Sequence, residues 1–225
     1  LAQLPQCDIS SNPYGGATGT YGLINCVAIK YGAISIVVWF YEPSNGQGML
    51  ISSNAYLPGA STATNHLTFI YVGTNDYLYV GDWIGGSAWQ LSPVSISPGW
   101  HMVVYEEWAS STSGPYYVSG YLDGQYLGQI SSSTLPFMFG GNTLNLTYSV
   151  IGVGDGNAYP NAPNAWWWFN GTIAYVAIYN TVLSQSQVQQ LYQAGFPNTL
   201  FSNNLVVAYY LSLNIYNGSG YYFVP

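Results

Sequence analysis

The chain has 225 residues, of which 1 is Lys or Arg and 8 are Asp or Glu, so only 4% of the residues are charged. A typical soluble domain has about 25%. With Lys30 as the only basic side chain, nothing can neutralise a row of phosphates, which excludes nucleic-acid binding and attachment to membranes through basic residues. The 49% of hydrophobic and 17% of aromatic residues exclude a disordered chain.

Residues 1–26 are rich in Gly, Ser and Pro and are predicted to form an N-terminal arm. Cys7 and Cys26 are the only cysteines, and neither a CxxC motif nor the Cys/His spacing of a zinc or haem site is present. We expect them to form a disulfide that stabilises the fold by about 3 kcal/mol. The alternative is a pair of buried thiols.

The rest of the chain is predicted to be all-β. Runs of β-branched and aromatic residues are separated at short intervals by Gly, Pro, Asn and Ser, which is typical of a sandwich or barrel. The expected strands are 33–41, 66–72, 76–83, 100–108, 116–122, 147–154, 172–179 and 205–213. Asp123-Gly124 predicts a two-residue type I′ hairpin, because both residues tolerate a positive φ.

One short helix is predicted, at residues 185–194. Ser184 can cap its first turn, and Gln187 can complete a capping box with Ser184. Leu183 and Val188 occupy the positions of a hydrophobic staple. A Gly and a Pro directly after this segment end the helix.

No apolar run reaches the ~18 residues of a membrane span. Three features, one of which is the cysteine pair, favour an exported glycoprotein at the cell surface or outside the cell. The first residue is Leu rather than Met, which we interpret as removal of a signal peptide. Sequons for N-glycans stand at Asn145, Asn170 and Asn217.

The scarcity of charge also bears on the response to acid. Acid unfolding depends mainly on carboxylates and histidines that change protonation, and the chain has 8 of the former and 2 of the latter. We therefore expect its stability to vary little with pH, as an adaptation to acidic surroundings. The alternative is a drift of surface composition in a neutral medium.

Three motifs resemble those of the laminin-G-like, concanavalin-A-like jelly-roll superfamily. WHMVVYEEW (100–108) with VSGYLDGQYLG (118–128) resembles that family's Trp-His strand and the hairpin after it. FNGTIAYVAIYNTVLSQSQVQQLY (169–192) resembles its closing strand and short helix, and AISIVVWFYEP (33–43) an early strand. The resemblance implies one antiparallel jelly-roll sandwich over residues 27–225.

The C-terminal segment departs from the order of that family. NNLVVAYYLSLNIYNGSG (203–220) resembles the family's opening strand but follows the closing helix. We expect residues 204–213 to supply a displaced first strand, either in the same domain or to a neighbouring copy. In the second case Val206, Ala208 and Tyr210 would share one face of an inter-subunit strand.

No catalytic site is predicted. A retaining glycosidase needs two carboxylates about 5.5 Å apart, and Glu106 and Glu107 are neighbours on a strand that point to opposite faces. No G-x-S-x-G motif is present, and His66 and His101 have no nucleophile in a known motif. We therefore expect a protein that is not an enzyme, with His101 as a structural histidine of the sheet.

Calcium binding is an alternative that the resemblance implies, because laminin-G domains often hold Ca²⁺ with loop carboxylates and carbonyls. The Gly-rich segment 154–164 offers Asp155 and Asn157, but one carboxylate is few for Ca²⁺. The other interpretation is an Asx-type turn. We therefore expect no cofactor.

Tryptophans are the remaining candidates for contact with a ligand or partner. Trp83, Trp89 and the run Trp166-Trp167-Trp168 lie in or beside predicted loops. Three consecutive rings cannot all face one core, so at least one is expected to meet solvent, a glycan or another protein. The alternative is that all of them cover the core of the sandwich.

These features together predict a secreted, glycosylated, non-enzymatic protein that assembles with copies of itself into an extracellular filament or surface layer. The alternative is a carbohydrate-binding lectin or adhesin module, and an unrecognised glycoside hydrolase comes third. A structural subunit predicts apolar surface and strand sharing between copies. A lectin predicts one concave aromatic site with a few polar groups.

Overall fold

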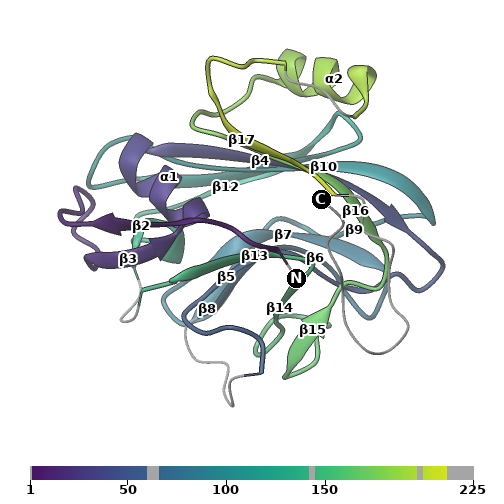
Figure 1. Cartoon of the computed structure of the whole chain (residues 1–225), viewed down its shortest axis with the longest axis horizontal. Helices are drawn as coiled ribbons and strands as arrows, with labels where there is room; N and C mark the ends of the chain where they lie inside the picture. The colour runs from purple at the N-terminus through teal and green to yellow at the C-terminus, as the bar shows by residue number, and fades with distance from the viewer. Residues whose placement is uncertain (1, 60–65, 142–144, 197–199, 212–225) are drawn as a thin grey trace.

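The computed structural model describes residues 2–59, 66–141, 145–196 and 200–211. In these ranges the chain forms a sandwich of two mostly antiparallel sheets with two helices, α1 (Leu23–Tyr31) and α2 (Gln185–Ala194). Figure 1 shows α2 lying over the outer side of one sheet, away from the other. The predicted all-β, jelly-roll class is confirmed.

The larger sheet has nine strands in the order β1-β13-β5-β6-β7-β8, with β9, β14 and β15 attached beside this path. Its strands are β1 (Ala2–Gln3), β5 (Gly48–Asn54), β6 (His66–Val72), β7 (Tyr77–Ile84), β8 (Ser87–Gln90), β9 (Val94–Ser95), β13 (Tyr148–Ile151), β14 (Val153–Asp155) and β15 (Trp166–Trp168). The pairing of β5 with β6 skips Phe69, since Ile51 lies opposite Ile70 and Ser52 opposite Thr68. This bulge turns Phe69 and Ile70 to the inside.

The smaller sheet has six strands in the order β12-β11-β10-β4-β16-β17. These are β4 (Ala33–Glu42), β10 (Gly99–Ala109), β11 (Tyr116–Leu122), β12 (Gln125–Ser132), β16 (Thr172–Tyr179) and β17 (Leu205–Tyr210). On β10 the side chains alternate, so Val103 and Tyr105 enter the main core between the sheets while Met102 and Val104 pack on the outer side. The main core also contains Phe40 from the smaller sheet.

The expected strands are largely found, with two differences. The segment predicted as one strand at 147–154 divides at Gly152, whose φ is 81°. Residues 212–213 of the last expected strand lie outside the described residues. The type I′ turn is confirmed by positive φ angles of 50° at Asp123 and 78° at Gly124.

The N-terminal segment differs from the expected arm. Strand β1 joins the larger sheet by pairing with β13, and β2 (Gln6–Ile9) pairs with β3 (Gly19–Gly22). The expected boundary at residue 26 falls inside α1, which sequence analysis missed. Residues 24–29 of this short helix are all buried, so it has no polar face to create a helical period.

The disulfide between Cys7 and Cys26 ties β2 to α1. Helix α1 also packs Ile24 and Val27 into the main core, at one end of the sandwich (Figure 1). Among the described residues, no helix has the length and apolar character needed to cross a membrane.

Helix α2 begins as predicted. The Ser184 side chain accepts a hydrogen bond from Gln187 N, and Gln187 Oε1 accepts one from Ser184 N at 2.8 Å, which completes the capping box. Leu183 and Val188 are buried together against the outer side of the smaller sheet. The helix is therefore fixed to that sheet by its first turn.

Strand β17 lies at the edge of the smaller sheet, antiparallel to β16. A register shift places Leu205 and Ala208 against the cluster under α2, while Val207 and Tyr209 pack against the main core. The shift breaks the simple alternation expected from the sequence.

Candidate functional site

Glu106, Glu107 and Asp82 do not provide an exposed catalytic pair. Glu106 and Glu107 point to opposite sides of the smaller sheet, as expected: Glu106 accepts from Leu183 N at 2.8 Å, and Glu107 accepts from the Tyr105 hydroxyl. Asp82 and Glu107 both lie between the sheets and are 0% exposed. Neither can reach a glycosidic bond.

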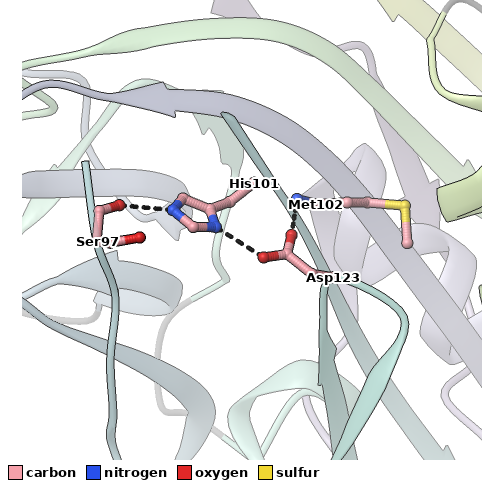
Figure 2. Close-up of polar contacts among 4 residues, drawn as sticks. All are labelled: Ser97, His101, Met102 and Asp123. Carbon is pink, nitrogen blue, oxygen red and sulfur yellow. Dashed lines mark hydrogen bonds and ion pairs between the residues drawn. The ribbon is translucent and has the colours of Figure 1, made fainter. Parts of the chain in front are cut away.

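His101 is held between two acceptors, as Figure 2 shows. Its Nδ1 lies 2.8 Å from Asp123 Oδ2 and its Nε2 lies 2.7 Å from the backbone oxygen of Ser97. Since both ring nitrogens face oxygens, the protonated ring suits this position, and the hydrogen bond to Asp123 raises the pKa of His101. Asp123 also accepts from Met102 N at 2.8 Å, so the group fixes the hairpin.

The segment proposed for calcium forms a turn. Asp155 is buried, and its Oδ1 accepts a hydrogen bond from Asn157 N at 2.8 Å. The backbone oxygen of Asn157 lies 2.9 Å from His66 Nε2. In the part of the chain that the structure describes, no three His, Cys, Asp or Glu side chains are grouped to hold a metal ion.

The outer side of the larger sheet is covered by the protein itself, and we call it the covered face. It consists of Met49, His66, Thr68, Tyr71, Tyr79 and Trp83, with Tyr159 from the segment between β14 and β15 lying over them. The Tyr71 ring stacks on that of Tyr79 at 4.6 Å, and its hydroxyl donates to Pro160 O at 2.9 Å. The Tyr159 hydroxyl accepts from Thr68 N at 2.8 Å, so these rings are enclosed and their hydroxyls are bonded.

The tryptophans singled out in the sequence belong mainly to this cover and to the core. Trp166, Trp167 and Trp168 form β15 and are half-buried, and Trp167 packs against the covered face. Trp83 contacts Tyr159, with 5.2 Å between the ring centroids. Trp89 packs against the main core.

A different group of rings lies on the outer side of the smaller sheet, and three of its five members are exposed to solvent. We call it the aromatic row, which consists of Tyr41, Trp100, Phe196, Trp39 and Tyr192 in spatial order. The centroid distances between successive rings are 5.6, 5.1, 5.3 and 5.7 Å. Trp100 is 47% exposed, and Tyr41 and Tyr192 are each 39% exposed. Together they form an aromatic surface without charged members.

Register and helix placement build this row. Strand pairing sets Trp100 opposite Tyr41, and Trp39 lies two residues earlier on the same side of β4. Helix α2 brings Tyr192 into a stack with Trp39, at an angle of 6° between the rings. The Nε1 of Trp39 is buried and has no hydrogen-bond partner, so the row contains one unused donor.

Glu106 holds the helix in this place. Besides Leu183 N, it accepts from Ser119 Oγ at 2.7 Å and from Ser35 Oγ at 3.1 Å. Burial raises the pKa of this carboxyl, and the three donors oppose that effect. Glu106 is thus a positioning residue for the row.

The aromatic row was not predicted from the sequence, because exposed rings were expected in or beside loops and not on strands. The available signal was strand alternation, which places Trp39 and Tyr41 on one side of a strand. That Trp100 lies beside Tyr41 depends on the pairing of β4 with β10, which local sequence does not specify.

Comparison with known proteins identifies the fold. No family model matches the chain, and no curated protein matches it in sequence. Among solved structures, a “putative carbohydrate binding protein” from Bacteroides ovatus is 15% identical, with a TM-score of 0.51 over 84% of this chain and 48% of that one. The chain therefore spans about half the length of that protein.

Two further structures have lower TM-scores. The CBM40 of the Ruminococcus gnavus IT-sialidase is 14% identical, with a TM-score of 0.49 over 85% of this chain and 94% of that one. A heptameric SAP-like pentraxin from Limulus polyphemus is also 14% identical, with a TM-score of 0.45 over 72% and 70%. At 15% identity, the likeness to the Bacteroides ovatus protein shows a shared fold and no particular family.

Proposed function

We propose that the chain is a non-enzymatic carbohydrate-binding domain and that the aromatic row is its sugar-contacting surface. The observation that carries the proposal is the continuous run of rings, three of which present exposed faces on a rigid sheet and helix. Tyr and Trp combine a large apolar face with a polar tip, which suits the mixed apolar and hydroxyl surface of a sugar ring. This proposal replaces the filament subunit as the leading interpretation.

The fold and the carboxylates support the same proposal. The sandwich is shared with the Bacteroides ovatus protein, whose name describes carbohydrate binding, so the scaffold is compatible with this function. The buried carboxyl pair between the sheets has no access to a substrate. The Trp39 Nε1 has no hydrogen-bond partner in the fold and is a donor within the row.

We further propose that the ligand is a neutral glycan. Recognition of carboxylate or sulfate groups relies mainly on Arg or Lys. The only basic residue is Lys30 on α1, with its Nζ 5.3 Å from the centre of the Tyr31 ring rather than in the row. Sialylated and sulfated sugars are therefore expected to bind more weakly than neutral ones.

Affinity electrophoresis tests this function with neutral polysaccharides (laminarin, xyloglucan, mannan) and with sialyllactose as a competitor. We expect retardation by at least one neutral polysaccharide, lost in the double variant Trp100→Ala, Tyr41→Ala. Trp108→Ala is the matched control, because Trp108 lies on the same strand and the same side, about 27 Å away at ~3.4 Å per residue. Equal retardation of the double variant and the control would reject the row as the site.

Self-assembly remains a second candidate because of the edges of the smaller sheet. Neither β12 (QYLGQISS) nor β17 (LVVAYY) contains a charge or a proline, the usual protection against pairing with another chain. Among the described residues, no further strand pairs with either edge, and Val206 and Tyr210 are exposed on β17. In this proposal, the displaced strand acts in cis and its edge joins the next copy.

Light scattering and negative-stain imaging of the wild type and of Val206→Lys test this candidate. Assemblies in the wild type that disappear in the variant would support it, since the added charge blocks edge pairing. A wild type that stays monomeric at high concentration would contradict it.

Export and N-glycosylation are also proposed. Asn170 is exposed, which suits an attached glycan. The Asn145 side chain donates to Thr18 O at 3.1 Å, so a glycan there must leave that hydrogen bond intact. Asn217 lies outside the described residues. Mass spectrometry of native material before and after glycosidase treatment tests all three sites.

A further inference from the structure

Two acidic side chains meet in the middle of the sandwich. Asp82 comes from β7 of the larger sheet and Glu107 from β10 of the smaller one, and each is 0% exposed. Each of the two carboxyl groups affects the pKa of the other. Lys30 is the only basic side chain of the protein, and it is exposed on α1. No basic side chain therefore balances the two carboxyl groups.

The neighbouring donors account for three of the four carboxyl oxygens. Asp82 Oδ1 accepts from Trp83 N at 2.5 Å, and Asp82 Oδ2 accepts from Met138 N at 3.2 Å. Glu107 Oε2 accepts from the Tyr105 hydroxyl. Glu107 Oε1 is buried and has no hydrogen-bond partner. Two ionised carboxylates in contact repel each other, whereas a single proton between them provides a strong hydrogen bond.

We propose that Glu107 Oε1 carries a proton and donates it to Asp82, so that one bound proton joins the two sheets and makes the fold more stable in acid than at neutral pH. Glu107 is then neutral and Asp82 carries the single negative charge of the pair. That charge is met by the two backbone N–H groups of Trp83 and Met138. In this arrangement every carboxyl oxygen of the pair takes part in a hydrogen bond.

The surroundings favour retention of the proton. Burial raises the pKa of both carboxyl groups, and the charge of Asp82 raises that of Glu107 further. The other titratable group facing the pair is Tyr105 on β10. Burial raises the pKa of its hydroxyl and also that of Tyr159 on the covered face, which keeps both neutral. On β6, the neighbour of Tyr105 is the uncharged Phe69, with ring centroids 5.3 Å apart.

The sign of the effect follows from proton linkage. Between the ordinary pKa of a glutamate, about 4.3, and the raised pKa in the fold, the folded chain holds a proton that the unfolded chain has released. The contribution is fully present below the unfolded pKa and is lost as the pH rises through the folded pKa. Glu42, Glu106 and His101 have raised pKa values and act in the same direction, so a variant must isolate the pair.

The variant Glu107→Gln isolates it, because the amide keeps a permanent donor toward Asp82 and an oxygen for Tyr105. We expect the difference in Tm between about pH 4.5 and about pH 7.5 to be smaller in Glu107→Gln than in the wild type. Asp8→Asn, which changes an exposed carboxylate, is the control and should keep the wild-type difference. Asp82→Asn should lower the Tm at both pH values, because both oxygens of Asp82 accept from backbone N–H groups that cannot reverse.

Infrared difference spectroscopy gives a direct reading that does not depend on unfolding. At about pH 6 the wild type should show the C=O stretch of protonated buried carboxyls, from which one component is lost in Glu107→Gln and none in Asp8→Asn. Equal Tm differences in Glu107→Gln and the wild type would overturn the proposal. So would the absence of a Glu107-dependent carboxyl band.

Discussion

Both outer sides of the sandwich carry several aromatic rings, which are mainly buried on one side and partly exposed on the other. On the covered face, Tyr71, Tyr79 and Tyr159 are buried, and their hydroxyls bond to groups of the same chain. In the aromatic row, Trp100 and Tyr41 stand open beside a helix that covers only part of the sheet. The same residue types thus close one side of the protein and leave the other available for contact.

This difference shows that aromatic content alone does not locate a binding surface. Rings with bonded hydroxyls and buried faces belong to the structure, whereas rings with exposed faces on rigid elements are available to a ligand. The segment between β14 and β15 covers the outer side of the larger sheet. The helix α2 leaves the end of the smaller sheet near Trp100 uncovered.

The largest expected effect is on the covered face. Tyr71→Ala removes a fully buried ring and leaves a cavity beneath Tyr159, so we expect a loss of about 3–5 kcal/mol in the free energy of unfolding. Urea denaturation at a fixed pH measures it. Glycan retardation of the folded fraction should stay at the wild-type level. Loss of binding without loss of stability would mean that the covered face, and not the row, holds the ligand.

The second effect concerns the row. Trp100→Ala should weaken binding to the best neutral polysaccharide by about 2 kcal/mol, which is roughly 30-fold, because exposed aromatic anchors dominate binding energy. Its cost in stability should be smaller than that of Tyr71→Ala, since the Trp100 ring is half exposed. Trp100→Phe should retain most of the affinity if ring contact is the cause. Equal losses in the Phe and Ala variants would contradict stacking.

How far the sequence predicts these two sides depends on the range of the interactions. Alternation and capping are local, so β4, β11 and α2 were found close to their observed bounds. Helix α1 was not predicted, because residues 24–29 are all buried and the sequence shows no alternation between an apolar and a polar face. The row needs the register between β4 and β10 and the position of α2, both of which are set by contacts between residues far apart in the chain. The Trp166–Trp168 run pairs into the larger sheet and is half-buried, so its role as a contact surface stays a prediction.

The expected response to acid changes for a similar reason. The small number of carboxylates in the sequence predicted a stability that varies little with pH. The burial of individual carboxyl groups, however, has more influence on this dependence than their number. Burial raises the pKa of Glu42 to about 7, and Glu106 and the Asp82–Glu107 pair are shifted in the same direction. The structure therefore predicts a fold that gains stability toward acid and loses it as the pH rises through about 7.

The third effect tests how the row is held. Glu106→Ala leaves the Ser119 hydroxyl without its acceptor and removes the shorter of the two hydrogen bonds of Leu183 N, so we expect a loss of about 1–3 kcal/mol in stability. Binding should weaken as well, because the start of α2 is released and Tyr192 moves relative to Trp39. Glu106→Gln keeps an acceptor for Leu183 N and should restore most of both properties. Tryptophan fluorescence and affinity electrophoresis report the two readouts separately.

The smallest expected effect comes from the helix cap. Ser184→Ala removes the acceptor for Gln187 N and should cost about 1 kcal/mol in stability. Because Tyr192 lies at the opposite end of α2, the first turn can fray while the stack with Trp39 persists, so the loss of affinity should be smaller than in Trp100→Ala. Gln190→Ala is the control within the same helix and should be neutral or slightly stabilising, since Ala has the highest helix propensity. If Ser184→Ala instead abolished binding while the global stability fell by only this amount, the whole of α2 would have to move as one unit. The aromatic row would then be a surface that opens and closes with the helix, in contrast to the fixed cover on the other side of the sandwich.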